Sequence, residues 1–275
     1  MQTRTSLFLI VVLGLGIMAC QQTESTEPTT DAPAMEVPSQ TEAPADYWAY
    51  RALEASGGAE AWAALPYLAF EFGFGTAEGR NPGRKHLWNR MNGDYRVEYI
   101  DGTDSTWVVL FNTNTREGQV AVNGVAVADT AEVASRLQRA YGAYINDTYW
   151  LLMPAKLLDE GVQRSYVPDS ADATSEVIKL AFDGVGLTPG DQYWITLDKE
   201  TGQVTQWAYQ LQSYPPDRAA TAWTWTEYQT FESPAGPVTV STAKQGSRGT
   251  LFTDHVEVPA EVPTDAFTSL APMLF

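Results

Sequence analysis

Large apolar residues alternate with small or polar residues along most of this chain. The alternation is clear where Phe70, Phe72 and Phe74 are interleaved with Glu71 and Gly73. Successive side chains of a β-strand point to opposite faces, so this period of two predicts strands that bury one face. A chain built from such strands must find a cover for a long apolar surface.

Turn signals divide the alternating runs into hairpins. Asn92-Gly93, Asp101-Gly102 and Asn123-Gly124 supply the positive φ that tight turns between antiparallel strands need. After a first strand around 70–74, the predicted strands lie at about 84–90, 94–101, 105–113, 120–127 (a hairpin), 161–167, 175–183, 191–198, 203–213, 221–232, 236–245 and 248–257. We therefore expect about 10–12 antiparallel strands.

One insert in the middle of the chain has helical spacing. Residues 129–158 predict two helices, the first with an N-cap at Asp129 or Thr130. Asn146 or Asp147 would cap the second helix, which Pro154 would bend or end.

The predicted fold class is mainly β with helices (α+β). A further helix is expected over 46–55, with Asp46 as its N-cap, followed by a short helical turn over 59–65. A sheet of so many strands with one apolar face cannot stay flat and open, because that face would remain in water. We expect a single curved antiparallel sheet or incomplete β-barrel, with the helices as a lid.

The beginning of the chain indicates export. Residues 7–18 form an apolar run that is too short to span a bilayer and has the length of a signal-peptide core. It leads to Cys20, the only cysteine of the sequence, in the context IMAC, which resembles the lipobox of bacterial lipoproteins. The resemblance implies a signal peptide over 1–19 and a Cys20 that carries the lipid anchor.

Residues 20–45 contain no Lys, Arg or aromatic residue and are rich in Pro, Thr, Ser and Glu. Such a composition cannot bury enough apolar surface to offset the entropy of ordering, so a disordered tether is expected. Gln21 stands where an aspartate would favour the inner membrane in lipoproteins of this type, which points to the outer membrane. The remaining residues, 46–275, are expected to form one domain.

The order of these parts is similar to that of the bacterial lipoprotein-carrier (Lol-type) superfamily, which includes outer-membrane lipoprotein-sorting factors. Two stretches, ASGGAEAW at 55–62 and INDTYWLLMPAKL at 145–157, resemble segments of an uncharacterised lipoprotein family with this fold. The resemblance implies an apolar cavity between sheet and helices that holds acyl chains. It carries over no catalytic residue, and no membrane-insertion loop for delivering lipoproteins is recognisable.

Composition argues against several classes of function. Asp and Glu number 34 against 17 Lys and Arg, a formal net charge of −17, which makes nucleic acid a poor partner. The two histidines, His86 and His255, have no metal-ligand spacing, and no cofactor motif is present. Ser247, in the sequence QGSRG at 245–249, is expected to lie in a turn rather than to act as a nucleophile.

The strongest candidate for a site is an aromatic and apolar set. Nine Trp, thirteen Tyr and ten Phe exceed what an ordinary core needs. The candidate ligand-binding residues are Phe70, Phe72, Phe74, Trp88, Trp107, Phe111, Tyr149, Trp150, Met153, Trp194 and Trp207. Each of them could equally be ordinary core.

These observations favour a monomeric, lipid-anchored, non-enzymatic protein of the bacterial envelope that binds a lipid, a lipoprotein acyl chain or a similar apolar ligand. The alternative is a scaffold lipoprotein with a fully packed core that binds a protein partner, and a hydrolase is the third reading. A continuous apolar space of several hundred Å³ would support the first reading over the second.

Overall fold

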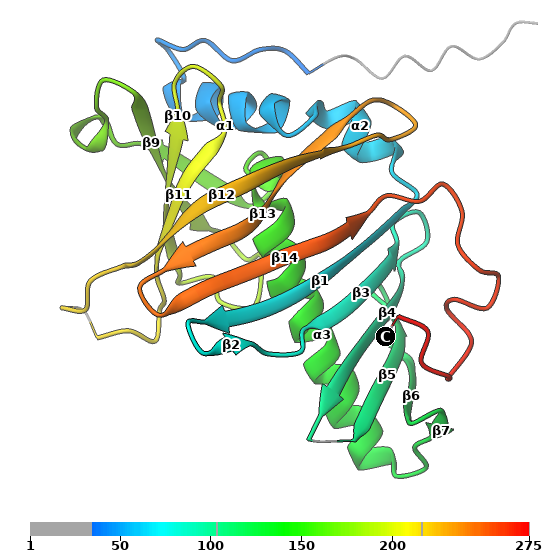
Figure 1. Ribbon diagram of the computed structural model, residues 1–275. Helices are drawn as coiled ribbons and strands as arrows, with labels where there is room; N and C mark the ends of the chain where they lie inside the picture. The colour runs from blue at the N-terminus through cyan, green and yellow to red at the C-terminus, as the bar shows by residue number, and fades with distance from the viewer. Residues whose placement is uncertain (1–34, 103, 216, 275) are drawn as a thin grey trace, which may run out of the picture. The chain divides into compact units, whose positions relative to one another are not determined.

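The computed structural model describes residues 35–102, 104–215 and 217–274, and its compact unit spans Val37–Phe275. The strands of this unit form a single 14-stranded antiparallel sheet in the order β7-β6-β5-β4-β3-β1-β14-β13-β12-β11-β10-β9-β8, with β2 paired to β1 (Figure 1). The strands are β1 (Tyr67–Thr76), β2 (Gly79–Arg80), β3 (Arg84–Asn89), β4 (Asp94–Asp101), β5 (Ser105–Asn112), β6 (Gly118–Val122), β7 (Val125–Ala126), β8 (Val162–Tyr166), β9 (Ser175–Phe182), β10 (Gln192–Asp198), β11 (Val204–Gln210), β12 (Thr221–Phe231), β13 (Val238–Gly246) and β14 (Gly249–Glu257).

The expected curved antiparallel sheet is confirmed. Its order begins at β7 and ends at β8, so the sheet is open rather than a closed barrel. The number of strands exceeds the expected 10–12. The two-residue strand β2 was not predicted because it is too short to show an alternating pattern, whereas β7 is the second arm of the hairpin predicted at 120–127. The predicted turn at Ser247 is confirmed, since this residue lies between the paired ends of β13 and β14.

The helices are α1 (Pro44–Ala55), α2 (Gly58–Ala64) and α3 (Thr130–Leu152), with 3₁₀ turns η1 (Met153–Lys156) and η2 (Pro168–Ser170). Figure 1 shows α3 running across one face of the sheet. Of the two predicted caps, Asp129 is the one that caps α3, because its Oδ1 accepts hydrogen bonds from the backbone N–H of Ala131 and Glu132. No described helix has the combination of length and apolarity that crossing a membrane requires.

Two sequence expectations about the helices are wrong. Helix α3 continues through Asn146 and Asp147 as one element of 23 residues, so neither residue caps a second helix. Asp147 is instead buried inside α3 and paired with side chains of β3. The opening helix begins before Asp46, whose side chain gives no cap hydrogen bond and pairs with Arg164 at 2.6 Å.

The outer side of β4 is covered by the last residues of the chain. Arg96 is fully buried, and its Nε lies 2.5 Å from Oε1 of Glu98. The Arg96 Nη1 group donates to the carbonyls of Ala266 at 3.1 Å and Ser269 at 2.8 Å. Glu98 in turn accepts from the backbone N–H of Met273 at 3.0 Å. Every charged atom of this buried pair therefore has partners, as burial demands.

Candidate functional site

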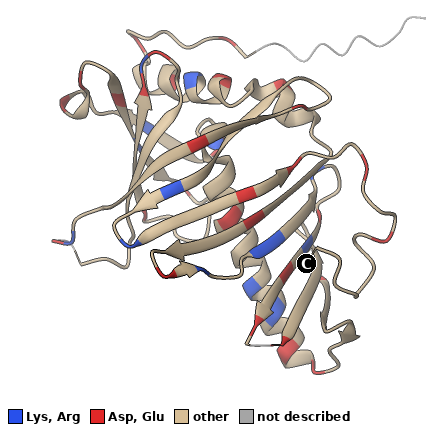
Figure 2. Cartoon of the chain, viewed as in Figure 1, with Lys and Arg blue, Asp and Glu red and all other residues tan. Residues whose placement is uncertain are grey.

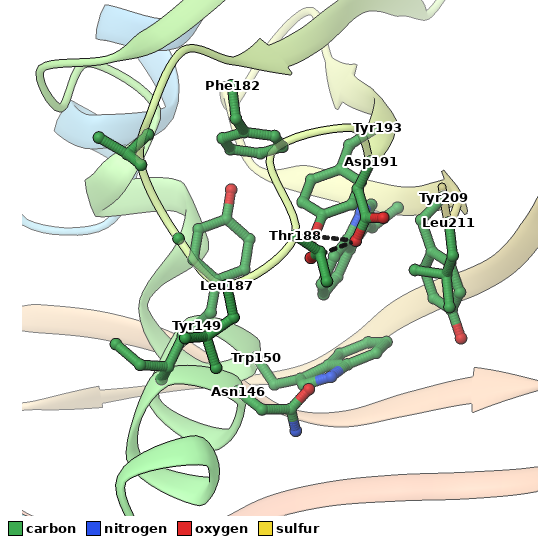
Figure 3. Close-up of a pocket in the computed structure, with 14 residues that line it drawn as sticks. Asn146, Tyr149, Trp150, Phe182, Leu187, Thr188, Asp191, Tyr193, Tyr209 and Leu211 are labelled. Atoms are coloured by element: carbon green, nitrogen blue, oxygen red, sulfur yellow. Dashed lines mark hydrogen bonds between the residues drawn. The ribbon is translucent and has the colours of Figure 1, made fainter. Parts of the chain in front are cut away.

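The described structure contains an apolar cavity of about 370 Å³ beside the second half of α3 (Figure 3). Strands β9 to β11 form its walls, and the loop between β9 and β10, residues 183–191, closes one side. We call it the aromatic pocket. Its lining residues are Ile145, Asn146, Tyr149, Trp150, Phe182, Val185, Gly186, Leu187, Thr188, Asp191, Tyr193, Trp207, Tyr209 and Leu211.

Aromatic rings from the helix and the sheet meet at this pocket. The ring centroids of Trp150 and Trp207 lie 4.2 Å apart, and Tyr149 is 5.6 Å from Trp207. Tyr193 lies 5.0 Å from Trp207, and Tyr209 lies 5.6 Å from it. These are the tilted and edge contacts that aromatic pairs prefer, so the rings support one another beside the open space.

The residue spacing along α3 and the register of β10 with β11 turn these aromatic side chains toward the pocket. Tyr149 and Trp150 lie one turn of α3 beyond Ile145 and Asn146, which brings all four residues to the pocket. In the sheet, Tyr193 of β10 is directly opposite Tyr209 of β11, so the two side chains share a face.

A buried carboxylate fixes the loop of the pocket. Asp191 is only 2% exposed, and its Oδ2 accepts a hydrogen bond from Oγ1 of Thr188 at 2.7 Å. Its Oδ1 accepts the backbone N–H of Gln212 at 2.8 Å, and the hydroxyl of Tyr193 lies 3.5 Å from Oδ2. Burial and the nearby Asp191 charge raise the pKa of Tyr193, so this phenol keeps its proton.

Two further donors at the pocket walls have no hydrogen-bond partner among the described residues. They are the hydroxyl of Tyr149 and Nε1 of Trp207, both buried. Burial raises the pKa of Tyr149 well above its usual value, so its hydroxyl stays neutral. These neutral polar groups lie buried within walls whose exposed surface is mainly apolar, as it is in most small-molecule sites.

The structure brings three of the predicted site residues, Tyr149, Trp150 and Trp207, to the aromatic pocket. Phe70 and Met153 lie in the closed core, with relative exposures of 2% and 0%. Phe72 and Phe74 pack as half-buried residues at the edge of that core. None of these four lines the pocket.

The other predicted residues also lie elsewhere. Trp88 and Phe111 pack with Tyr144 of α3, at ring distances of 5.3 and 6.5 Å. Trp107 is covered by the guanidinium of Arg136, 3.5 Å from its ring centroid. Trp194 follows Tyr193 in β10 and so faces the opposite side of the sheet. Cys20 lies outside the described residues.

Sequence reasoning missed several pocket residues. Tyr209 shares the alternating face of Trp207 in β11, and Tyr193 is its cross-strand partner, so the alternation carried a signal for both. Phe182 is the last residue of β9, but Leu187 and Thr188 belong to a loop. No periodic pattern marks a loop residue as part of a pocket.

A second group of polar side chains, largely buried, joins Asp147 in the second half of α3 to residues of β3 and β4. Arg84 donates from Nε and Nη2 to the two carboxylate oxygens of Asp147, at 2.6 and 2.8 Å. Nε2 of His86 lies 3.1 Å from Asp147, and its Nδ1 lies 2.9 Å from the hydroxyl of Tyr95. No serine hydroxyl hydrogen-bonds to His86 in the part of the chain described here, so this group has no Ser-His-Asp arrangement.

The titration of this group is set by burial and pairing. Burial alone would raise the pKa of Asp147, but the polar contact with His86 and the hydrogen bonds and positive charge of Arg84 outweigh it and hold the pKa below its ordinary value. Burial lowers the pKa of His86, which the Asp147 carboxylate offsets only in part. Asp147 is therefore a carboxylate and His86 a neutral imidazole at neutral pH, and the structural ion pair of this group is that of Asp147 with Arg84.

Neither a protein-family model nor a curated protein matches the sequence. Three solved structures are similar to the chain at low identity. A domain assigned as an outer membrane lipoprotein-sorting protein from Vibrio parahaemolyticus has 10% identity and a TM-score of 0.42, covering 80% of this chain and 94% of that one. A DUF1329 family protein from Desulfovibrio piger has 9% identity and a TM-score of 0.42, with 80% and 94% covered. A LolA superfamily protein from Nitrosomonas europaea has 9% identity and a TM-score of 0.41, with 77% and 99% covered.

Proposed function

We propose that this chain binds an elongated apolar ligand, a lipid or lipoprotein acyl chain, in the aromatic pocket and performs no catalysis on it. The observation that carries the proposal is the cavity of about 370 Å³ between α3 and β9 to β11. Its volume lies near the lower end of the range of about 300–1,000 Å³ found for small-molecule sites. One slender chain is therefore a better fit than several acyl chains.

The chemistry of the walls supports an apolar ligand with few polar atoms. Trp150, Trp207 and Leu211 offer large apolar surfaces, and burial of apolar area yields roughly 25 cal/mol per Å². The charged group of the lining, Asp191, already accepts three hydrogen bonds. It therefore gives a ligand little to bind, and the energy of association would come from the rings.

The location proposed with this function is the outer membrane, through a lipid on Cys20. The support is the lipobox-like IMAC sequence and the aromatic-free tether after it. Two or three acyl chains at about 0.8 kcal/mol per buried methylene would hold the protein on a bilayer. The full-length chain carrying Cys20→Ser should move to the soluble fraction of the envelope, and its retention in the membrane would contradict the anchor.

The test of ligand binding uses residues 20–275 with Cys20→Ser, which is the expected mature chain without its lipid. Native mass spectrometry of this protein, purified without detergent, should show a co-purifying acyl species or uptake of added dodecanol. The pocket is then blocked with Ile145→Trp, which adds an indole to the cavity wall. The matched control is Val125→Trp on β7, an exposed position (68%) outside the pocket.

Loss of uptake in Ile145→Trp and retention in Val125→Trp would support the proposal. A clean apo mass with no uptake by the unblocked protein would overturn it and favour the scaffold, whose core needs no ligand. Equal uptake by both variants would show that the ligand binds outside the aromatic pocket.

A further inference from the structure

A second cavity, of about 320 Å³, lies between the first half of α3 and the strands β3 and β4. We call it the arginine pocket, because Arg84, Arg136 and Arg139 line it together with the carboxylate of Asp101. Figure 2 shows basic residues on this part of α3 and at the beginning of β3. Three positive groups in one lining are unusual for a chain with a formal net charge of −17.

Two of the three arginines are held in fixed positions. Arg84 forms its two hydrogen bonds with Asp147, which is fully buried. Arg136 donates from Nε to Glu132 at 2.7 Å and from Nη1 to Asp101 at 2.9 Å. The Nη1 group of Arg84 and the Nη2 group of Arg136 have no acceptor among the described residues. Donors that are already oriented can bind an anion with little further loss of side-chain entropy.

Arg139 is the arginine of this lining that pairs with no carboxylate. It is exposed, and no acidic side chain in the described ranges forms an ion pair with it, whereas Asp147 pairs with Arg84 and both Asp101 and Glu132 pair with Arg136. The three arginines are matched in number by these three carboxylates, so the site offers an anion guanidinium donors that have no acceptor rather than an excess of net charge. Arginine donors in a fork match the oxygens of phosphate, which can accept from more than one guanidinium at once.

The two pockets lie along one stripe of the same helix. Arg139, Ala143, Asn146 and Trp150 follow the spacing of one helix face, and they run from the arginine pocket to the aromatic pocket. The seven steps from Arg139 to Asn146 rise about 10 Å along the axis. The aromatic pocket has a carboxylate, Asp191, in its lining, which disfavours a negative group there. Guanidinium donors thus lie at one end of the stripe and an apolar cavity lies at the other.

From this arrangement we infer that the ligand is an anionic amphiphile, whose chain occupies the aromatic pocket and whose phosphate binds Arg84, Arg136 and Arg139. The inference rests on the proposed function, since it names the head group of the same ligand. A free phosphate ion offers the same oxygens to the arginines, so the test must separate the two sources.

The experiment measures binding by calorimetry to residues 20–275 with Cys20→Ser, below the micelle-forming concentration of each probe. The probes are dodecyl phosphate, dodecanol and inorganic phosphate. Dodecyl phosphate should bind more tightly than dodecanol, and added salt should reduce that difference because it screens charge. Arg139→Gln should weaken dodecyl phosphate about five-fold, the scale of one partly exposed ion pair, and leave dodecanol unchanged.

The matched control is Arg116→Gln, which removes the same charge from an exposed turn where Arg116 lies 4.2 Å over the ring of Tyr141, outside both pockets. It should bind dodecyl phosphate as the parent does. Equal, salt-independent binding of dodecyl phosphate and dodecanol would overturn the inference and leave the apolar site standing. Inorganic phosphate binding as tightly as dodecyl phosphate, with the same loss in Arg139→Gln, would show a free-anion site and also overturn it. If no alkyl probe binds, the proposed function fails and the inference fails with it.

Discussion

Two aromatic clusters pack against α3 but meet different surroundings. In the Tyr144 cluster, Tyr144 packs 5.0 Å from Tyr95 and 5.3 Å from Trp88, and none of these three rings lines either cavity described above. In the Trp150 cluster, Tyr149 and Trp150 pack as closely on Trp207, yet a cavity of about 370 Å³ remains beside them. A surplus of rings therefore does not by itself produce a pocket.

The difference lies in what covers the rings. At the Tyr144 cluster, strands β3 to β5 face α3 directly. At the Trp150 cluster, part of the cover is the loop over residues 183–191, in which Leu187 is 57% exposed. Strands bring side chains onto a helix at a regular spacing, whereas a loop leaves space beside the rings that a ligand can fill.

The largest effect is expected from Asp147→Ala, next to the Tyr144 cluster. The substitution leaves Arg84 and His86 beside a buried cavity with no carboxylate. Breaking a buried ion pair by removing one partner costs about 3–5 kcal/mol, and the lower end applies because Arg84 is partly exposed. We expect a loss of about 3 kcal/mol in the free energy of unfolding, measured by urea denaturation at pH 7.

The matched control is Asp159→Ala, which breaks the exposed pair with Lys156 and should cost less than about 1 kcal/mol. Since the pKa of Asp147 is lowered, its contribution is complete above the ordinary value near 4 and is lost as the pH falls through the folded value. A loss in Asp147→Ala no larger than in Asp159→Ala would show that the Arg84–Asp147 ion pair does not stabilise the contact between α3 and β3.

Asp147 also illustrates a contact that the sequence pattern could not predict. Alternation and turn dipeptides were enough to predict the sheet, because strand faces and hairpins are local properties. Asn146-Asp147 looked like a helix boundary because both residues favour caps. The partner of Asp147 is Arg84, 63 positions earlier, and only the folded chain brings the two together.

The pocket was predictable to the same limited extent. Tyr149, Trp150 and Trp207 stood out as large rings on a helix and a strand, and they line the cavity. Trp88 and Phe111 stood out equally, but they pack with Tyr144, away from the aromatic pocket. The sequence shows which side chains share a face, whereas the cover over each part of that face is set by tertiary contacts.

Two buried bases of the molecule, His86 and Lys244, are compensated differently, which gives the second prediction. His86 faces the carboxylate of Asp147, but Lys244 of β13 is fully buried, with Nζ donating to the Ser241 carbonyl at 2.6 Å and to Thr253 Oγ1. Burial lowers the pKa of Lys244 well below its usual value. In the window between the folded and the ordinary pKa, the unfolded chain binds a proton that the native chain does not, so stability rises with pH.

Lys244→Met should remove this dependence. A buried polar group that is replaced by an apolar one of similar volume is often neutral or stabilising, so the variant should be at least as stable as the parent at pH 7. Its advantage should shrink as the pH rises towards 10, by up to about 1.4 kcal/mol per pH unit. Urea denaturation at several pH values measures it, and parallel curves for the two proteins would contradict the prediction.

The smallest change in stability is expected at the loop of the pocket. Leu187→Ala removes an exposed side chain and should alter the free energy of unfolding by less than about 0.5 kcal/mol. Its effect on ligand uptake should be larger, a loss of roughly 1 kcal/mol in dodecanol binding, because Leu187 would lose its contact with the ligand. Val125→Ala, at an exposed apolar position on β7, should change neither quantity. If Leu187→Ala destabilised the fold as a core substitution does, the loop would be part of the packing, and the contrast between the two aromatic clusters would no longer hold.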